Sequence, residues 1–155
     1  MAPQTDLAWG VGDSEGDRSC ADRFPADRFP IVVLVSGSGS NLQAIIDTLH
    51  LKVAGIEVVL VVSNVPGVLA LERAEKAGIP TAVFQLEDYP GREARDLAMA
   101  AAIEATGARL VVLAGYMNLL TPAFLTRFPY GIINLHPALL PAFPGTQANQ
   151  DAHHY

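Results

Sequence analysis

Short runs of apolar residues alternate along the chain with segments in which apolar residues recur every three or four positions. Residues 31–37 are apolar until they meet Ser and Gly, and residues 57–64 repeat this pattern. Such runs are typical of strands that are buried on both faces of a sheet. Between them lies one apolar stripe of a helix, formed by Leu42, Ile45, Ile46 and Leu49. These segments predict a strand, a helix and a second strand.

The alternation continues to residue 137. Further strands are expected at residues 81–86, 109–117 and 131–137. A helix that begins at Leu69 is stopped by Gly78 and Pro80, and a short helix runs from Thr121 and Pro122 to about Phe128. A helix ending near Gly107 has an inner face predicted from Ala94, Leu97, Ala98 and Ala101.

Regular alternation of strands and helices needs right-handed crossovers and produces a parallel sheet covered by helices. We therefore predict an α/β domain, a Rossmann-like doubly wound and mainly parallel sheet with flanking helices, over residues 31–155. Ligands are expected at the carboxyl ends of its strands. Residues 1–30 contain the tandem repeat ADRFP-ADRFP and lack periodicity, which predicts a disordered leader. The leader is either a docking tail or an extension without a role.

Composition narrows the classes of partner. The net charge is -6 and the pI about 5.0, which disfavours a nucleic-acid partner. The apolar runs are far shorter than the roughly 20 residues that span a bilayer, so no membrane helix is expected. No secretory signal follows Met1, and the single Cys20 cannot form an intramolecular disulfide, so a cytoplasmic location is expected.

Glycines and serines at the junction of the first strand and first helix, SGSGSN at residues 36–41, predict a phosphate site. Free amides at a helix start, with the helix dipole, bind anions, and the hydroxyls of Ser38 and Ser40 add donors. No lysine follows, as a P-loop requires, and Leu42 stands where a dinucleotide site has its third glycine. A phosphomonoester is therefore favoured, and an ordinary tight turn is the alternative.

The fifth expected strand ends in NLHPALLPAFPG, residues 134–145. Period-two geometry places Asn134 and His136 on one face of the sheet. An amide can donate hydrogen bonds to a developing oxyanion and an imidazole can move protons, so the pair suits attack of a nucleophile on a carbonyl. By itself the pair favours a structural histidine and a strand-terminal asparagine over a catalytic pair.

Three blocks together resemble the phosphoribosylglycinamide formyltransferase family: SGSGSNLQAIID at residues 36–47, VVLAGYMNLLTPAF at 111–124, and NLHPALLPAFPG. The resemblance covers residues 31–155 and implies the N-terminal portion of a formyltransferase fold. It also implies transfer of a formyl group from 10-formyltetrahydrofolate to the amine of 5'-phosphoribosylglycinamide, in de novo purine biosynthesis and without a metal. Formyltetrahydrofolate deformylase, another folate-dependent formyltransferase, or a non-catalytic phosphate-binding fragment remain alternatives.

The resemblance assigns roles to individual residues. Asn134 and His136 match catalytic residues that stabilise the tetrahedral intermediate and assist proton movement. The phosphate of the ribosyl substrate is held at positions that match Gly39, Ser40 and Asn41. Folate-binding positions match Arg92, Met117, Asn118, Leu119 and Leu120. Arg92 has the alternative of a solvated residue at a helix start.

This sequence also departs from the family pattern. Asn118 stands where an arginine is common, which puts a charge contact there in doubt. The family's catalytic aspartate falls beyond Tyr155, and Asp151 is not in its context, so we expect impaired turnover and an aggregation-prone fifth strand. A cis bond before Pro141 is a further hypothesis. The terminal pair of His153 and His154 lacks a third ligand and predicts no metal site, and the oligomeric state is left open.

Overall fold

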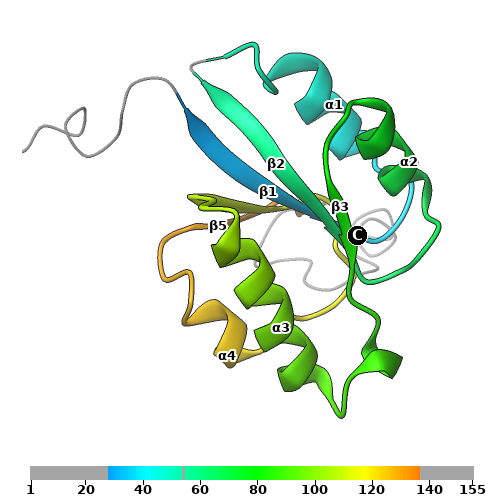
Figure 1. Cartoon of the computed structure of the whole chain (residues 1–155), viewed down its shortest axis with the longest axis vertical. Helices are drawn as coiled ribbons and strands as arrows, with labels where there is room; N and C mark the ends of the chain where they lie inside the picture. The colour runs from blue at the N-terminus through cyan, green and yellow to red at the C-terminus, as the bar shows by residue number, and fades with distance from the viewer. Residues whose placement is uncertain (1–27, 54, 137–155) are drawn as a thin grey trace, which may run out of the picture.

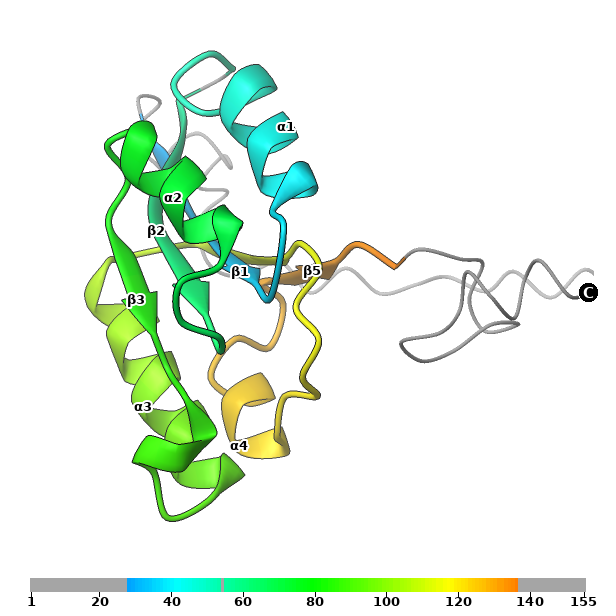
Figure 2. The same ribbon diagram turned by 90° about the vertical axis from the view of Figure 1, so that its right-hand side faces the viewer.

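Five parallel strands form one sheet in the order β3-β2-β1-β4-β5. The computed structural model describes residues 28–53 and 55–136 (Figure 1). The turned view of Figure 2 shows β3 and β5 on opposite sides of the sheet, as its two edge strands. The strands are β1 (Phe29–Val35), β2 (Ile56–Ser63), β3 (Thr81–Val83), β4 (Leu110–Leu113) and β5 (Ile132–Asn134).

Helices cover both faces of this sheet. One side of the sheet carries α1 and α2 and the other carries α3 and α4 (Figure 1). The helices are α1 (Ser40–Thr48), α2 (Leu69–Lys76), the 3₁₀ turn η1 (Leu86–Asp88), α3 (Arg92–Ala105) and α4 (Pro122–Leu125). The predicted doubly wound parallel architecture is confirmed.

The central strand β1 explains why this chain folds around two cores. Its residues alternate between the two faces, so Val33 and Val35 join the cluster under α1 and α2, while Val32 and Leu34 join the cluster under α3 and α4. All four are fully buried. A strand with apolar residues on both faces needs an apolar layer on each side, which is what the alternating helices supply.

The predicted elements are present, but several are shorter than expected. β1 begins two residues before the predicted domain start, at Phe29, which pairs with Ile56 of β2. β3 ends at Val83 and β4 at Leu113, and the chain after β4 turns at Gly115 with φ 78°. In both cases the apolar run of the sequence continues beyond the strand into the loop that follows. Length of an apolar run overestimates strand length when the loop that follows is itself half-buried.

The predicted inner face of α3 is wrong. Leu97 and Ala101 are exposed, and Ala94 and Ala98 are only half-buried. The residues of α3 that are buried are Arg95, Asp96, Met99, Ala100 and Ile103. The helix is rotated from the predicted orientation because a pair of opposite charges, Arg95 and Asp96, occupies its buried face.

Thr121 precedes α4, and Pro122 is its first residue, as predicted. The predicted capping bond is absent, however, because the Thr121 hydroxyl is buried without a hydrogen-bond partner among the described residues. The Thr121 carbonyl instead accepts hydrogen bonds from Phe124 and Leu125. α4 ends at Leu125, three residues before the predicted end.

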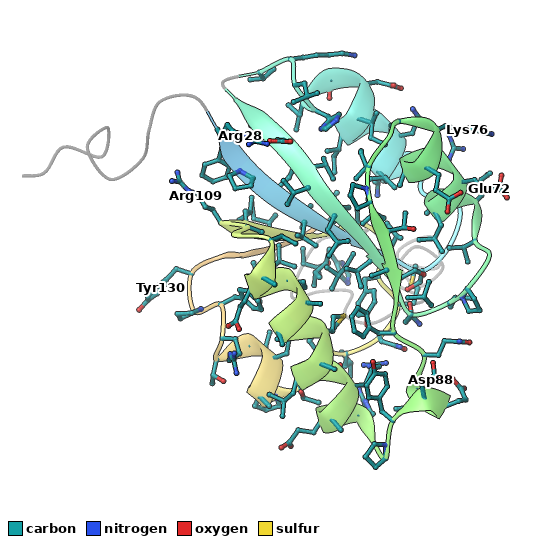
Figure 3. All side chains as sticks on the ribbon, viewed as in Figure 1. Arg28, Glu72, Lys76, Asp88, Arg109 and Tyr130 are labelled. Carbon is teal, nitrogen blue, oxygen red and sulfur yellow. The ribbon has the colours of Figure 1, made fainter. Side chains whose placement is uncertain are left out.

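An apolar groove of about 230 Å³ lies beside β5 on the α1 side of the sheet. Ile45, Leu49, Leu110, Ile133 and Leu135 line it. Ile133 and Leu135 are exposed. Polar and charged side chains such as Glu72, Lys76 and Tyr130 project outward elsewhere (Figure 3). In the part of the chain that the structure describes, no helix is long and apolar enough to cross a membrane.

Candidate ligand-binding site at the carboxyl edge of the sheet

The strand order reverses between β1 and β4. The chain builds β1, β2 and β3 in one direction, and β4 then pairs with the other side of β1. Loops that follow β1 and β4 diverge to opposite faces at such a switch point, and the crevice between them is where doubly wound sheets bind ligands. We call residues 36–41 the cradle and residues 114–121 the β4 loop; the two flank this point.

The cradle has the geometry of an anion site. Gly39 is buried, has φ 69° and stands at the N-cap of α1, where no side chain caps the helix. Ser40 and Asn41, which begin the helix, are exposed. Backbone amides in a first helical turn have no partner within the helix, and they favour negative charge. The residues predicted to hold the phosphate therefore lie at a helix start whose first residues are accessible to solvent.

Hydrogen bonds and close packing with α2 hold the cradle in shape. The Ala70 amide donates to the Gly37 carbonyl (3.1 Å), and Arg73 Nε donates to the Ser38 carbonyl (2.9 Å). Arg73 also donates through Nη1 to the side-chain oxygen of Gln43 (3.0 Å). Gly39 packs so closely on Ala70 that a Cβ atom added to the glycine would lie 2.6 Å from the Ala70 Cβ. Packing against α2 thus requires glycine at this position.

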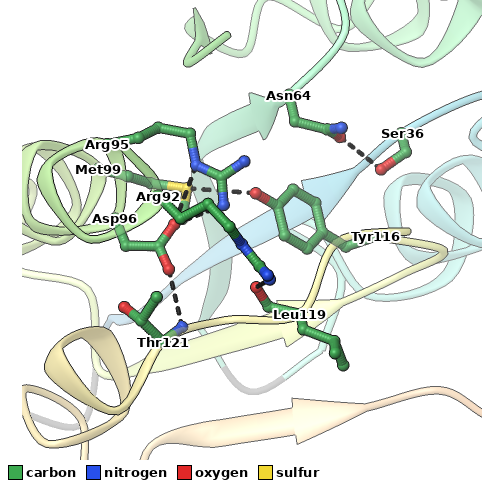
Figure 4. A network of polar contacts seen from close by, with 9 residues as sticks. All are labelled: Ser36, Asn64, Arg92, Arg95, Asp96, Met99, Tyr116, Leu119 and Thr121. Carbon is green, nitrogen blue, oxygen red and sulfur yellow. Dashed lines mark hydrogen bonds and ion pairs between the residues drawn. The ribbon is translucent and has the colours of Figure 1, made fainter. Parts of the chain in front are cut away.

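The β4 loop is fixed from two sides, and Figure 4 shows the contacts on the α3 side. On the β1 side, Ser36 donates its amide to the Gly115 carbonyl (3.1 Å) and accepts the Met117 amide at its hydroxyl (2.8 Å). On the α3 side, Arg92 Nη2 donates to the Leu119 carbonyl (2.8 Å), and the Thr121 amide donates to Asp96 Oδ2 (2.8 Å). The loop that carries the predicted folate segment therefore has a defined backbone.

Side chains of the predicted folate segment differ in exposure. Met117 is 60% exposed and Leu119 is 79% exposed, whereas Asn118 and Leu120 are half-buried. Arg92 lies at the same loop, and its bond to the Leu119 carbonyl argues against a purely solvated role. The structure brings all five predicted folate residues together, with two exposed apolar side chains that could lie against a flat ring.

A buried ion pair on α3 supports the β4 loop. Arg95 Nε and Nη2 donate to Asp96 Oδ1 at 3.0 and 2.6 Å, and the side chains are 1% and 0% exposed. Buried charges are costly unless they are paired and hydrogen-bonded. The second carboxylate oxygen of Asp96 serves the Thr121 amide, so both oxygens have partners. The ion pair joins the N-terminal half of α3 to the end of the β4 loop.

Asn134 is the last residue of β5 and is exposed. It pairs with Leu113 of β4, which pairs with Leu34 of β1, so all three stand in one row at the carboxyl edge. Two strand spacings, about 10 Å, separate β5 from β1. His136 follows two residues later and is half-buried. The cradle and Asn134 therefore lie at the same edge of the sheet, as predicted.

Tyr116 of the β4 loop is half-buried, and this burial raises its pKa above the ordinary value of 10.0. The Arg95 charge opposes this shift and the Asp96 charge adds to it. Because the folded state keeps its proton after the unfolded chain has lost it, stability should fall as pH rises above about 10. Absorbance titration of the phenolates should show a late-ionising component that disappears in Tyr116→Phe. Loss of an early-ionising tyrosine instead would contradict the expectation.

The sequence predicted neither the link that Ser36 makes, although Ser36 lies in the SGSGSN motif, nor the role of Asp96. Ser36 and Asp96 each bind loops far away in the chain, and neither lies in a pattern that predicts this. Among residues 28–53 and 55–136, no group of three His, Cys, Asp or Glu side chains could hold a metal ion. His153, His154, Asp151 and the Leu140–Pro141 bond lie outside the described residues.

A parallel sheet whose central strand leads through a glycine-lined turn into a helix defines a doubly wound α/β domain. The chain belongs to the formyl transferase family, whose model matches residues 29–154. It is 42% identical to the phosphoribosylglycinamide formyltransferase of Escherichia coli over 122 residues. These aligned residues make up 79% of this chain and 58% of that protein. The trifunctional purine biosynthetic protein adenosine-3 of Drosophila pseudoobscura is 44% identical over 124 residues, 79% of this chain and 9% of that protein.

Solved structures agree with this assignment. A glycinamide ribonucleotide transformylase of Symbiobacterium toebii superimposes with a TM-score of 0.78 at 44% identity, covering 82% of this chain and 60% of that one. The phosphoribosylglycinamide formyltransferase of Campylobacter jejuni gives 0.79 at 38% identity, over 84% and 69%. The chain thus spans well under two thirds of the length of the curated relatives described above.

Proposed function

We propose that this chain forms the phosphate-binding and formyl-transfer part of a phosphoribosylglycinamide formyltransferase of purine biosynthesis. Its substrates are then 5'-phosphoribosylglycinamide and 10-formyltetrahydrofolate. The observation that carries the proposal is the placement of an uncapped, glycine-lined helix start and of Asn134 at the same edge of the sheet. The names of the relatives support the choice of substrates.

The proposed reaction assigns one role to each part of the edge. The cradle amides hold the phosphate, and the β4 loop with Arg92 lies against the folate. The substrate amine attacks the formyl carbon, so a new C–N bond forms and the carbonyl oxygen becomes negative. Asn134 donates a hydrogen bond to that oxygen. The bond from the formyl carbon to N10 of the folate then breaks, the amine loses a proton and N10 gains one, with His136 assisting the transfer.

Binding tests the cradle first. Calorimetry should detect 5'-phosphoribosylglycinamide but not the same compound without its phosphate. Because the site binds through backbone amides, a ligand with less negative charge on its phosphate should bind more weakly. High salt should weaken binding as well. Equal affinity for the two compounds would remove the phosphate assignment.

A product assay tests the chemistry and separates the alternatives. We expect formylated product, at the impaired rate predicted from the sequence, only when the amine substrate is present. An Asn134→Ala variant should lose a further 10²- to 10³-fold or so in rate, about the usual effect of removing one oxyanion donor. Formate released at an unchanged rate without the amine substrate would instead identify a deformylase. Binding of both ligands without any formyl transfer would identify a non-catalytic fragment.

A further inference from the structure

Ser36 makes more connections between loops than its place in a turn requires. It is the first residue after β1, and its hydroxyl donates to Asn64 Oδ1 (2.5 Å) just beyond β2. The same oxygen accepts the Met117 amide (2.8 Å), and the Ser36 amide donates to the Gly115 carbonyl (3.1 Å). One residue thereby joins the ends of β1, β2 and β4.

The direction of these bonds makes the hydroxyl hard to replace. A serine oxygen can donate one hydrogen bond and accept two, and Ser36 uses both functions at once. Figure 4 shows Ser36 beside Asn64, with the hydrogen bond between them drawn. Removing the oxygen leaves the half-buried Asn64 oxygen and the Met117 amide without this partner.

Ser36 also occupies the point at which the two halves of the proposed site meet. It is the first residue of the cradle, and Met117 begins the predicted folate segment. Elsewhere the cradle is held by α2 through Ala70 and Arg73, and the β4 loop is held by α3 through Arg92 and Asp96. These supports lie on opposite faces of the sheet, so Ser36 supplies a direct link between the loops.

We propose that Ser36 is a positioning residue. Its hydroxyl fixes the position of the β4-loop backbone relative to the cradle, and a ligand bound at one of these two loops thereby affects the conformation of the other. The proposal rests on the proposed function for the identity of the two ligands. It requires no contact between Ser36 and either of them. Because coupling between two sites is reciprocal, each ligand should then favour the loop geometry that the other needs.

Amide hydrogen exchange on the full chain tests the positioning role without any ligand. In Ser36→Ala, exchange at Met117 should accelerate about fivefold relative to exchange at the core residue Val33, as expected for loss of one hydrogen bond. The Val33 amide corrects for general destabilisation. Ser36→Thr, which keeps the hydroxyl, should restore slow exchange, and Thr48→Ala, which removes an exposed hydroxyl on α1, should have no effect. Equal acceleration at Met117 and Val33 would overturn the proposal.

Ribose 5-phosphate then tests transmission. In the unmodified chain it should shift the amide resonances of the cradle and slow exchange at Met117, and in Ser36→Ala only the cradle resonances should shift. Cradle shifts with no change at Met117 in the unmodified chain would overturn the coupling and leave the proposed function intact. Absence of cradle shifts would count against the phosphate assignment, while the exchange comparison still decides the role of Ser36.

Discussion

A Gly39→Ala variant is expected to lose about 3 kcal/mol of stability and most of its affinity for phosphate ligands. Gly39 has φ 69°, and a left-handed conformation costs an L-residue about 1 to 2 kcal/mol. The added Cβ would also lie 2.6 Å from the Ala70 Cβ and 2.8 Å from its Cα. The second contact is with backbone, so a change of side-chain rotamer cannot relieve it. The cradle must move away from α2, and the first-turn amides move with it.

Gly78→Ala is the matched control for this prediction. Gly78 has φ 72°, but nothing lies within 4 Å of a Cβ added there. It should lose only the conformational part, about 1 to 2 kcal/mol, and should keep phosphate binding. Urea unfolding and calorimetry on both variants measure the two effects. If the two variants lose the same stability and both bind phosphate, close packing of Gly39 on α2 does not shape the site.

An Asp96→Asn variant is expected to destabilise the protein by about 3 to 5 kcal/mol, because it leaves the Arg95 guanidinium buried without its counter-charge. The asparagine keeps the size of the side chain, so packing changes little. A smaller part of the loss comes from weakening the bond that the Thr121 amide donates. Urea unfolding measures the total loss.

The exposed pair of Arg127 and Glu104 supplies the comparison. Its side chains are 45% and 37% exposed, and the bond to Arg127 lowers the pKa of Glu104. Exposed ion pairs contribute little because water and salt screen them. Glu104→Gln should therefore leave the unfolding midpoint nearly unchanged at neutral pH. Similar losses in Asp96→Asn and Glu104→Gln would show that burial of the Arg95–Asp96 pair has no special energetic consequence.

The same ion pair explains the largest error in predicting the fold from sequence. Apolar runs located all five strands, because a strand buried on both faces leaves a local signal at residues such as Val32 and Val33. The orientation of α3 followed a different rule. Hydrophobic periodicity assigns charged residues to solvent, yet Arg95 and Asp96 neutralise each other and face the sheet. Their burial depends on a partner and on Thr121, which is 25 residues away in the chain.

Some parts of the candidate site could likewise be predicted from the sequence, and others could not. The cradle could be predicted because its glycines and the helix start are adjacent in sequence. Asn134 could be placed at the carboxyl edge because the strand pattern fixed its position in β5. Ser36 could not be recognised as a link, since its hydroxyl binds the amide of Met117, 81 residues away. Contacts between loops depend on strand order, and the order of β1 and β4 is a property of the whole sheet.

Amide resonances recorded during titration with 5'-phosphoribosylglycinamide test the central claim most directly. The claim is that one ligand contacts the cradle and the end of β5 at once. We predict shifts at the amides of Gly39, Ser40 and Asn41 together with the side-chain amide of Asn134. Shifts confined to the opposite edge of the sheet, near Gly107, or shifts in the cradle that leave Asn134 unchanged at saturation, would contradict it.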